Sequence, residues 1–465
     1  MTMDEKTTEP RESYSRRDIL RIGSVLGIGA SMAGAGLSAC ATEPENSPVP
    51  ANVKGVDPVR VAMVGVGNQG SGHFRSLLAI EGVELRAVCD TVEEKVAKMQ
   101  ALAEEAGKPK PKGYSRGEYD FQRMCAEEEL DLVVTATPWK WHVPICVEAM
   151  KTGSHAATEV PAAVTIEECW ELVETAEKYN KHCVMLENVC YMRPEMMILN
   201  MVRRGLFGEL LHAEGAYNHD LRELKLGGAY EKDWRVYHSM TRNGNLYPTH
   251  GLGPIAQCMN INRGDRFDYL VSMSSPSRGL QEYAQKTLGP DHEFSKAEYK
   301  LGDVNTSLIK TVNGKTIYLV HDTNLPRPYS RINLIQGTKG ITQGFGDMNH
   351  ENLIHIEGRT PAHKWEPLMT HADEFEHPFI KAYQEKSVGG GHGGADFLEL
   401  YRLVHCIRNG LPTDMDVYDG ADWSVVSGLT EESVANRSRP VDFPDFTRGL
   451  WETRKPLGII GEEQA

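Results

Sequence analysis

The chain has 465 residues, of which 40% are hydrophobic and 25% are charged. These proportions are those of a globular protein with room for two domains, and they exclude a disordered chain and a membrane-embedded body. The 65 acidic side chains outnumber the 50 basic ones and give a formal net charge of -15. Because such a charge repels polyanions, we expect no nucleic-acid partner. The nine cysteines include no Cys-X-X-Cys pair, and the sequence predicts no metal site.

Residues 1–39 have the layout of an export signal. Arg16 and Arg17 precede a Gly- and Ala-rich apolar stretch at residues 22–37, which is typical of a twin-arginine signal peptide. The stretch ends in Leu-Ser-Ala-Cys, which resembles the lipobox where a bacterial signal peptidase cuts before a cysteine. Cys40 would then be the lipid-carrying N-terminus of the mature protein. A cut after another small residue, or a retained anchor, is the alternative.

Each of these alternatives exports the chain. We expect a periplasmic or cell-surface protein whose only membrane contact is a lipid anchor at Cys40. Residues 40–57 carry prolines among polar residues and predict a flexible linker. The twin-arginine route carries folded proteins, so a cofactor can be loaded in the cytoplasm before export.

A dinucleotide-binding domain is predicted for residues 58–190. Residues 59–64 form a short apolar strand pattern that leads into Gly65-Val66-Gly67-Asn68-Gln69-Gly70 and then a helical stretch through Ala79. The first glycine suits a tight turn, the second lets the backbone approach a pyrophosphate, and the third allows close packing of helix on strand. Amides at the helix N-terminus would face the phosphates.

The next strand, at residues 83–88, ends close to Asp90, twenty residues after Gly70. A carboxylate at this place accepts hydrogen bonds from a ribose 2'-hydroxyl and repels a 2'-phosphate, so we expect NAD rather than NADP. The alternative is a glycine turn in a doubly wound sheet that binds nothing.

Three further strands carry polar or aromatic residues where they end. Residues 130–136 lead to Trp139-Lys140-Trp141-His142, residues 154–158 lead to Glu159-Val160, and residues 182–186 lead to Glu187-Asn188. Ligands of open α/β sheets lie beyond the carboxyl ends of the strands, so these segments should line the cofactor crevice. Taken singly, the two tryptophans would more often be packing residues.

The periodicity changes in residues 191–465, for which we expect a substrate-binding α+β domain. A helix at 196–204 precedes alternating patterns at 209–217, 266–274, 306–312, 315–321 and 332–336, which predict an open, mainly antiparallel sheet. Residues 227–233 are expected to form a loop over the site. The glycine-rich segment 389–394 precedes a helix at 395–409 and would be a hinge, or a lid beside the pocket. The tail from Arg448 is expected to be peripheral. The fold class is therefore α/β, with a doubly wound parallel sheet followed by the α+β domain.

The chain resembles the glucose-fructose oxidoreductase and inositol dehydrogenase superfamily of two-domain NAD(P) proteins. Its members usually carry Glu-Lys-Pro where this chain has Glu159-Val160-Pro161. The lysine of that motif helps to move the proton of the hydroxyl being oxidised, so Val160 argues against simple alcohol dehydrogenation.

A closer resemblance is to glycoside hydrolase family 109, the NAD-dependent α-N-acetylgalactosaminidases. It rests on the blocks Pro-Trp-Lys-Trp-His from residue 138, Glu-Asn-Val-Cys-Tyr from 187, Asn-Gly-Asn-Leu-Tyr-Pro-Thr-His-Gly from 243 and Gly-His-Gly-Gly from 391. The resemblance covers the chain from about residue 60 to residue 447. It implies an enzyme that hydrolyses terminal α-linked N-acetylgalactosamine, with NAD as its cofactor and a glycan or small molecule as its substrate.

The family's functional residues fall on matching positions of this sequence. Together with Gly65, Gly67 and Gly70, the implied cofactor contacts are Asn68, Gln69, Asp90, Trp139, Lys140, Trp141, His142, Glu159, Val160 and Asn188. The implied substrate contacts are Tyr217, Arg235, Tyr247, Pro248, Thr249, His250 and Tyr329.

Each of these residues also has an alternative, purely structural interpretation. Arg235 would be a surface ion-pair partner, Tyr217 and Tyr329 would be core tyrosines, and Thr249 would be only the cap of a helix. His219 and Asp220 suggest a metal site, but no third ligand follows at a suitable spacing.

The resemblance implies a redox cycle in place of the two flanking carboxylates of ordinary glycosidases. NAD takes hydride from C3 of the sugar, the resulting ketone acidifies the C2 hydrogen, and the C1 oxygen leaves by elimination. Water then adds and the hydride returns. His250 would take the proton of the 3-hydroxyl, and Tyr191 is the candidate base at C2. An exported NAD-dependent sugar oxidoreductase and a sugar-binding lipoprotein remain alternatives, and a homo-oligomer is left open.

Overall fold

The computed structural model describes residues 53–228, 234–346 and 350–456. The signal, the lipobox with Cys40 and most of the linker lie outside these residues. Within them, no helix is both long and apolar enough to cross a membrane. Each of the eight cysteines in this part of the chain is buried and free.

The first part of the chain forms a six-stranded parallel sheet with the strand order β3-β2-β1-β4-β5-β6. This is the order of a doubly wound dinucleotide-binding fold. The strands are β1 (Val59–Val64), β2 (Val83–Cys89), β3 (Lys112–Tyr114), β4 (Leu132–Thr135), β5 (His155–Thr158) and β6 (Cys183–Met185). The helices between them are α2 (Asn68–Ala79), α3 (Glu93–Glu105), α4 (Asp120–Glu127), α5 (His142–Lys151) and α6 (Ile166–Tyr179).

The turn between β1 and α2 depends on glycine. Gly65 has φ of 78°, a left-handed conformation that side chains disfavour. A Cβ atom added to Gly70 would lie 1.9 Å from the carbonyl oxygen of Gly65. A Cβ atom on Gly67 would meet only Lys95 Nζ, at 3.9 Å. The turn therefore has no room for a side chain at Gly70, whereas the space next to Gly67 is free.

The second part contains a nine-stranded sheet with the order β14-β13-β12-β11-β7-β10-β9-β8-β15. All its pairs are antiparallel except β7 with β10, so the predicted open, mainly antiparallel sheet is confirmed. The longer strands are β7 (Leu210–Asn218), β8 (Phe267–Ser274), β9 (Val304–Thr311) and β10 (Thr316–Asp322). The shorter ones are β11 (Leu334–Gly337), β12 (Gly340–Gln343), β13 (Leu353–Ile356), β14 (Glu366–Pro367) and β15 (Val441–Asp442).

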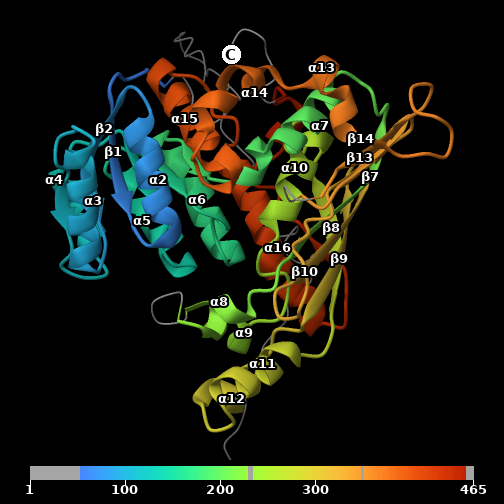
Figure 1. The fold of residues 1–465 in the computed structure, drawn as a ribbon, viewed down its shortest axis with the longest axis horizontal. Helices are drawn as coiled ribbons and strands as arrows, with labels where there is room; N and C mark the ends of the chain where they lie inside the picture. The colour runs from blue at the N-terminus through green and yellow to red at the C-terminus, as the bar shows by residue number, and fades with distance from the viewer. Residues whose placement is uncertain (1–52, 229–233, 347–349, 457–465) are drawn as a thin grey trace, which may run out of the picture. The chain divides into compact units, whose positions relative to one another are not determined.

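Three long helices of the second part connect the two sheets. Helix α10 (Thr249–Met259) packs on β7, α15 (Ala395–Asn409) packs on α2, and α16 (Val417–Ala435) packs on both α6 and β8 (Figure 1). The remaining helices are α7 (Arg193–Arg203), α8 (Arg222–Leu226), α9 (Trp234–Thr241), α11 (Gly279–Leu288), α12 (Glu293–Lys296), α13 (Ala372–Phe375) and α14 (Pro378–Tyr383). The sheets thus divide near residue 190, but α15 and α16 belong to the packing of both.

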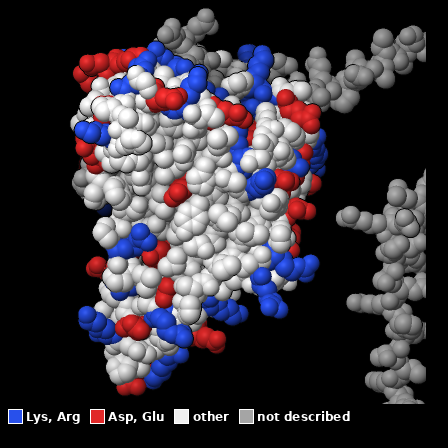
Figure 2. Space-filling view, turned by 90° about the vertical axis from the view of Figure 1, so that its right-hand side faces the viewer, with Lys and Arg blue, Asp and Glu red and all other residues white. Residues whose placement is uncertain are grey.

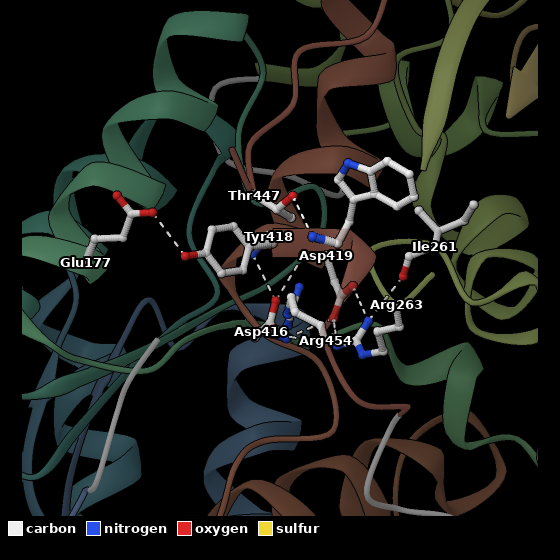
Figure 3. A network of polar contacts seen from close by, with 9 residues as sticks. Glu177, Ile261, Arg263, Asp416, Tyr418, Asp419, Thr447 and Arg454 are labelled. Carbon is white, nitrogen blue, oxygen red and sulfur yellow. Dashed lines mark hydrogen bonds and ion pairs between the residues drawn. The ribbon is translucent and has the colours of Figure 1, made fainter. Parts of the chain in front are cut away.

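A buried ionic network holds the start of α16 (Figure 3). Asp416 caps the helix, and Arg263 donates to both carboxylate oxygens of Asp419 at 2.7 Å. Arg454 contacts Asp416 from the C-terminal tail. Buried carboxylates need such partners because unpaired buried charge is costly.

The same network reaches the first domain through helix α6. Tyr418 Oη donates to Glu177 at 3.0 Å, and Arg448 pairs with Glu177 at 2.6 Å. No residue from Arg448 to residue 456 is buried, but the tail forms ion pairs with both helices. The tail fastens α16 to α6, and the sequence carries no local pattern that indicates such a long-range ion pair.

One face of the nine-stranded sheet carries exposed apolar side chains. Met273 on β8 is 62% exposed and Leu308 on β9 is 54% exposed. Figure 2 shows the side of the molecule on which this sheet lies, with charged side chains at the margins and a largely uncharged centre.

Candidate active site

The site lies where the carboxyl ends of the parallel strands meet helix α10 and strand β7. Glu159 follows β5, Glu187 follows β6, and His250 stands in the first turn of α10. The carboxyl edge is where ligands of open α/β sheets bind. Each of the two glutamates contacts a histidine, and these two pairs are the centre of the arrangement.

His250 and Glu187 form the first pair. Nδ1 of His250 lies 2.6 Å from Oε1 of Glu187, which is fully buried. A carboxylate at this distance accepts a hydrogen bond from Nδ1–H and so leaves Nε2 with its lone pair as the reactive nitrogen. The arrangement therefore prepares His250 to take a proton from a ligand hydroxyl.

Two glycines set the place of His250. A Cβ atom on Gly251 would lie 2.5 Å from the backbone nitrogen of Ala216, and one on Gly215 would lie 2.5 Å from the carbonyl oxygen of Gly251. Helix α10 and strand β7 therefore touch backbone to backbone. This contact fixes the depth at which His250 enters the site.

Glu159 and His73 form the second pair, with Oε1 and Nε2 2.5 Å apart. Burial alone would raise the pKa of Glu159, but the hydrogen bond and charge of His73 lower it below its ordinary value. Burial alone would lower the pKa of His73, and Glu159 raises it. The pair is therefore held as an ion pair.

Aromatic side chains from β7, from the segment before α10 and from the loop after β10 form a wall beside His250. The ring of Tyr217 lies 4.4 Å from that of Tyr247 and 5.4 Å from that of His250. Tyr329 stands edge-on to Tyr217 at 6.1 Å and to His219 at 4.9 Å. Burial raises the pKa of Tyr247 well above its ordinary value. Tyr217, Tyr247 and Tyr329 are thus brought together with His250, as the sequence predicts.

Arg235 contacts the same wall. Its guanidinium lies 5.2 Å from the ring centre of Trp139 and 5.4 Å from that of Tyr247. It lines a small cavity with both residues and with Lys225. Burial lowers the pKa of Lys225 to about 7. The stacked guanidinium supports a place in the site over that of a surface ion-pair partner.

Pro248 and Thr249 stand at the start of α10, immediately before His250. Thr249 is fully buried and its hydroxyl has no partner in the described residues. No side-chain cap to α10 is formed, so the alternative of a simple capping threonine is not supported. These two residues place His250 on the helix.

The residues that could hold a dinucleotide surround the glycine turn. Asp90 accepts hydrogen bonds from the backbone of Val66 at 2.8 Å and of Val92 at 3.0 Å. It is half-buried at the end of β2, and a carboxylate has lone pairs beyond these two bonds. Asn68 and Gln69 begin helix α2 directly after Gly67.

Asn188 offers a direct test of fit. Its Nδ2 donates to Asp396 at 2.7 Å, while its Oδ1 is buried without a partner in the described part of the chain. A buried, unpartnered acceptor beside a phosphate-binding turn suits the carboxamide of a nicotinamide. The open side of Gly67 leaves room for a pyrophosphate. The residues present therefore fit NAD.

Asp396 ties the glycine-rich segment to these residues. It also accepts from Gln69 Nε2 at 2.9 Å and contacts His392 Nδ1 at 2.9 Å. A Cβ atom on Gly391 would lie 2.1 Å from its carboxylate. Residues 389–394 therefore lie beside the cofactor-binding residues.

The side chains of residues 139–141, after β4, point to different parts of the structure. Trp139 is buried against Trp234 and Tyr247. Trp141 packs on Tyr119 at 5.1 Å. Lys140 is 63% exposed and lies 3.7 Å from Glu118. The structure therefore does not bring the side chain of Lys140 to the site.

His142 and Val160 have positioning roles. The two ring nitrogens of His142 lie 2.8 and 2.9 Å from the carbonyl oxygens of Pro161 and Thr137. The ring thus bridges the segments after β5 and β4 and has no nitrogen left for a ligand. Val160 is buried, and its backbone nitrogen donates to Glu159.

The hydroxyl of Tyr191 is engaged by a carboxylate, contrary to the role expected for it. Its hydroxyl donates to Asp414 at 3.1 Å, and its ring faces Phe379. Burial and the charge of Asp414 raise its pKa well above the ordinary value. A phenol held by a carboxylate is a poor base, so the structure does not support Tyr191 as the base at C2.

The carboxylate of Asp220 is engaged by an arginine. Asp220 pairs with Arg222 through both carboxylate oxygens, at 2.8 and 2.7 Å. No group of three or more His, Cys, Asp or Glu side chains that could hold a metal ion occurs in residues 53–228, 234–346 and 350–456.

Sequence reasoning assigned no catalytic or substrate-binding role to His73, Glu187, His219 or Asp396. Glu187 stood in a quoted motif at a strand end, so its position already signalled a role. His73 lies one helical turn after Gly70, where a buried polar residue is a weak signal. Asp396 contacts Asn188 across 208 residues of sequence, and no local pattern predicts that.

The fold and the site define a two-domain protein with an NAD-binding Rossmann domain. Residues 59–187 match the oxidoreductase family with an NAD-binding Rossmann fold, and residues 191–453 match the glycosyl hydrolase 109 C-terminal domain. The chain belongs to glycosyl hydrolase family 109.

Similar proteins agree with this assignment. A glycosyl hydrolase family 109 protein of Shewanella pealeana is 48% identical over 457 residues, which cover 96% of this chain and 99% of the relative. A protein of Shewanella oneidensis named alpha-N-acetylgalactosaminidase is 47% identical, with the same coverage. A solved structure of levoglucosan dehydrogenase with NADH and L-sorbose has a TM-score of 0.65 at 20% identity, and covers 84% of this chain and 100% of its own. This last likeness shows the fold.

Proposed function

We propose that the protein hydrolyses terminal α-linked N-acetylgalactosamine by an NAD-dependent cycle. The observation that carries the proposal is the Glu187–His250 pair, which lies between the carboxyl edge of the Rossmann sheet and the aromatic wall. The name of the Shewanella oneidensis relative, alpha-N-acetylgalactosaminidase, supports the substrate.

NAD, which the glycine turn, Asp90 and Asn188 would hold, would supply a reversible hydride acceptor. His250 Nε2 accepts the proton of the sugar 3-hydroxyl, and Glu187 stabilises the imidazolium that forms. Tyr247 and Arg235 orient the sugar, and Tyr329 closes the wall on the other side of Tyr217. Oxidation at C3 acidifies the C2 hydrogen, so elimination of the C1 oxygen becomes possible.

Glu159 and Glu187, the glutamates that follow β5 and β6, are each engaged with a histidine, which favours this route over a mechanism that uses these two as free carboxylates. Glu159 is paired with His73 and Glu187 with His250. In ordinary glycosidases one carboxyl protonates the leaving oxygen and the other attacks or activates water. Here the carboxylates hold imidazoles in place.

Turnover of a chromogenic α-N-acetylgalactosaminide in heavy water tests the proposal. We expect deuterium at C2 of the released sugar and no net accumulation of NADH. Cleavage without deuterium at C2 would indicate a carboxylate mechanism. NADH accumulation without cleavage would indicate the sugar oxidoreductase, against which the buried Val160 in place of a lysine already speaks.

We further propose that the protein is exported by the twin-arginine route and anchored in the periplasm or at the cell surface through a lipid on Cys40. Arg16, Arg17 and the Leu-Ser-Ala-Cys sequence support this. Replacing both arginines by lysine should retain the protein in the cytoplasm. Cys40→Ser should release it from the membrane fraction without changing its activity.

We also propose a homo-oligomer in which a second copy covers the exposed apolar face of the nine-stranded sheet. Met273 and Leu308 on this face support the proposal. Light scattering on the wild type and on the Met273→Glu/Leu308→Glu variant tests it, and a smaller mass of the variant is expected. An unchanged mass would contradict this face as the interface.

A further inference from the structure

Tyr217 and His219 form a close pair at the end of strand β7. Tyr217 Oη lies 3.1 Å from Nδ1 of His219. The backbone nitrogen of His219 donates to the carbonyl oxygen of Asp322 at 2.8 Å, and its ring stands perpendicular to that of Tyr329. The backbone hydrogen bond fixes the position of His219, and the contact with Tyr329 orients its imidazole next to the Tyr217 hydroxyl.

The surroundings keep His219 neutral. Burial lowers its pKa below the ordinary value, and the positive charge of Arg235 lowers it further. A neutral imidazole with a hydrogen on Nε2 accepts a hydrogen bond at Nδ1. The Tyr217 hydroxyl can then donate a hydrogen bond to Nδ1 of His219, 3.1 Å away.

Tyr217 is also the neighbour of His250 in the wall, with ring centres 5.4 Å apart. Tyr247 is also beside His250, at 5.0 Å, but it is the Tyr217 hydroxyl that contacts an imidazole able to accept its proton. If His250 serves the 3-hydroxyl, a group beside it is placed to reach an adjacent carbon of the sugar ring. The proposed function requires a base at one such carbon, C2. Tyr191, whose hydroxyl is held by Asp414, does not fill this role.

We propose that Tyr217 and His219 are the proton-carrying pair of the elimination, with Tyr217 as the base at C2 and His219 as the residue that accepts its proton. This inference rests on the proposed function. It assigns His219 a role that is distinct from binding, since His219 acts on the sugar through Tyr217.

The step balances as follows. The phenol proton moves to His219 Nδ1, and the C2–H bond of the 3-keto sugar breaks as its proton moves to Tyr217 Oη. The electron pair of that bond forms the C1=C2 double bond. The C1–O bond breaks with its electrons on the leaving oxygen, which takes a proton from a water molecule and leaves hydroxide. When this hydroxide adds at C1, Tyr217 returns a proton to C2 and recovers its own from His219, so that one water is consumed in the cycle.

The test uses the NAD-loaded full-length protein and the variants His219→Asn and Tyr217→Phe. Asn places an amide oxygen near the position of Nδ1, so it accepts the Tyr217 hydrogen bond but cannot take the proton. The matched control is His212→Asn on β7, the strand of Tyr217, where Nδ1 makes an exposed contact of 2.9 Å with Thr316 Oγ1, while the contact of His219 with Tyr217 is partly buried. Bound NAD and melting temperature are measured for every variant.

We expect His219→Asn to keep KM close to the wild-type value while kcat and deuterium exchange at C2 fall by about 10²-fold or more. The near-ultraviolet absorbance of reduced nicotinamide should still appear when substrate is added, because oxidation at C3 does not need this pair. Tyr217→Phe should lose the same C2 exchange, and His212→Asn should behave as the wild type.

Wild-type kcat in His219→Asn would overturn the proton relay and leave His219 a structural residue. Loss of the absorbance signal along with the exchange would place the defect before the elimination and would also contradict the pair. If His219→Asn destabilises the protein, the Tyr217→Phe variant provides the test. Deuterium exchange at C2 that is retained in this variant would overturn the inference. Absence of C2 deuterium in the wild type would overturn the proposed function itself, and the pair with it.

Discussion

Glu187, at the end of the first domain, and His250, in the second, lie 63 residues apart in the chain and meet at 2.6 Å at the carboxyl edge of the parallel sheet. The buried carboxylate fixes the tautomer of the imidazole and compensates the charge that forms when the imidazole takes a proton. The two residues therefore act as one unit across the boundary between the two sheets.

Loss of the carboxylate charge should slow the reaction without removing substrate binding. For Glu187→Gln we expect kcat to fall by about 10²–10⁴-fold with little change in KM. Steady-state kinetics on a chromogenic substrate measure this. Glu214→Gln on β7, whose side chain is 34% exposed beside His212, is the matched control and should retain full activity. Equal activity of the two variants would show that His250 works without Glu187.

Tyr191 should be dispensable for chemistry. Because its hydroxyl donates to Asp414 and not to the site, Tyr191→Phe should keep kcat within about threefold of the wild type. It should lose about 1–3 kcal/mol of unfolding free energy, since it removes a buried hydrogen bond to a carboxylate. Kinetics and denaturant unfolding test the two parts separately. A kcat reduced by about 10²-fold in a stable variant would restore Tyr191 as a catalytic base.

The glycine turn gives a test of cofactor retention. In Gly70→Ala the new Cβ would meet the Gly65 carbonyl oxygen at 1.9 Å, so the turn must distort and bound NAD should be lost. Gly72→Ala on the same helix is the control, because nothing lies within 4 Å of its Cβ. It should retain NAD and gain up to about 1 kcal/mol from helix propensity. NAD content after desalting and melting temperature are the measurements. Retained NAD in Gly70→Ala would contradict the proposed place of the pyrophosphate.

The Glu159–His73 pair predicts a pH dependence of stability. His73 has a pKa raised above 6.5, so its contribution is full below that value and is lost as the pH rises through the raised pKa. Glu159 has a pKa lowered below 4.5, so its contribution is full above that value and is lost as the pH falls through the lowered pKa. The pair therefore stabilises most between about pH 4.5 and 6.5.

Thermal unfolding of the wild type and of His73→Gln across pH checks this window. The difference in melting temperature should be largest within the window and should shrink toward alkaline pH. His355→Gln, a half-exposed histidine on β13 whose Nδ1 lies 2.9 Å from the Lys364 carbonyl oxygen, should show no such profile. A difference that stays constant with pH would mean that the pair is not ionised.

The sequence predicted those parts of the protein that depend on local patterns. The glycine turn, Asp90 and the strands of the first sheet follow from residues close in the chain, and so does the change to an antiparallel sheet. Tyr191 was misplaced because nearness to Asn188 in sequence says nothing of side-chain direction in the short 3-10 turn formed by residues 188–191. His219 and Asp396 act through partners that only the tertiary packing supplies.

Because of the backbone contact between Gly215 and Gly251, the position of the catalytic histidine and the recognition of the sugar can change independently of one another. The contact fixes His250 relative to the main chain of β7. Because it is made by backbone atoms, substitutions of surrounding side chains do not change it. Arg235 and Tyr329 project from a helix and a loop that lie outside this contact. Substitutions there can alter which sugar is accepted while the reacting groups keep their spacing.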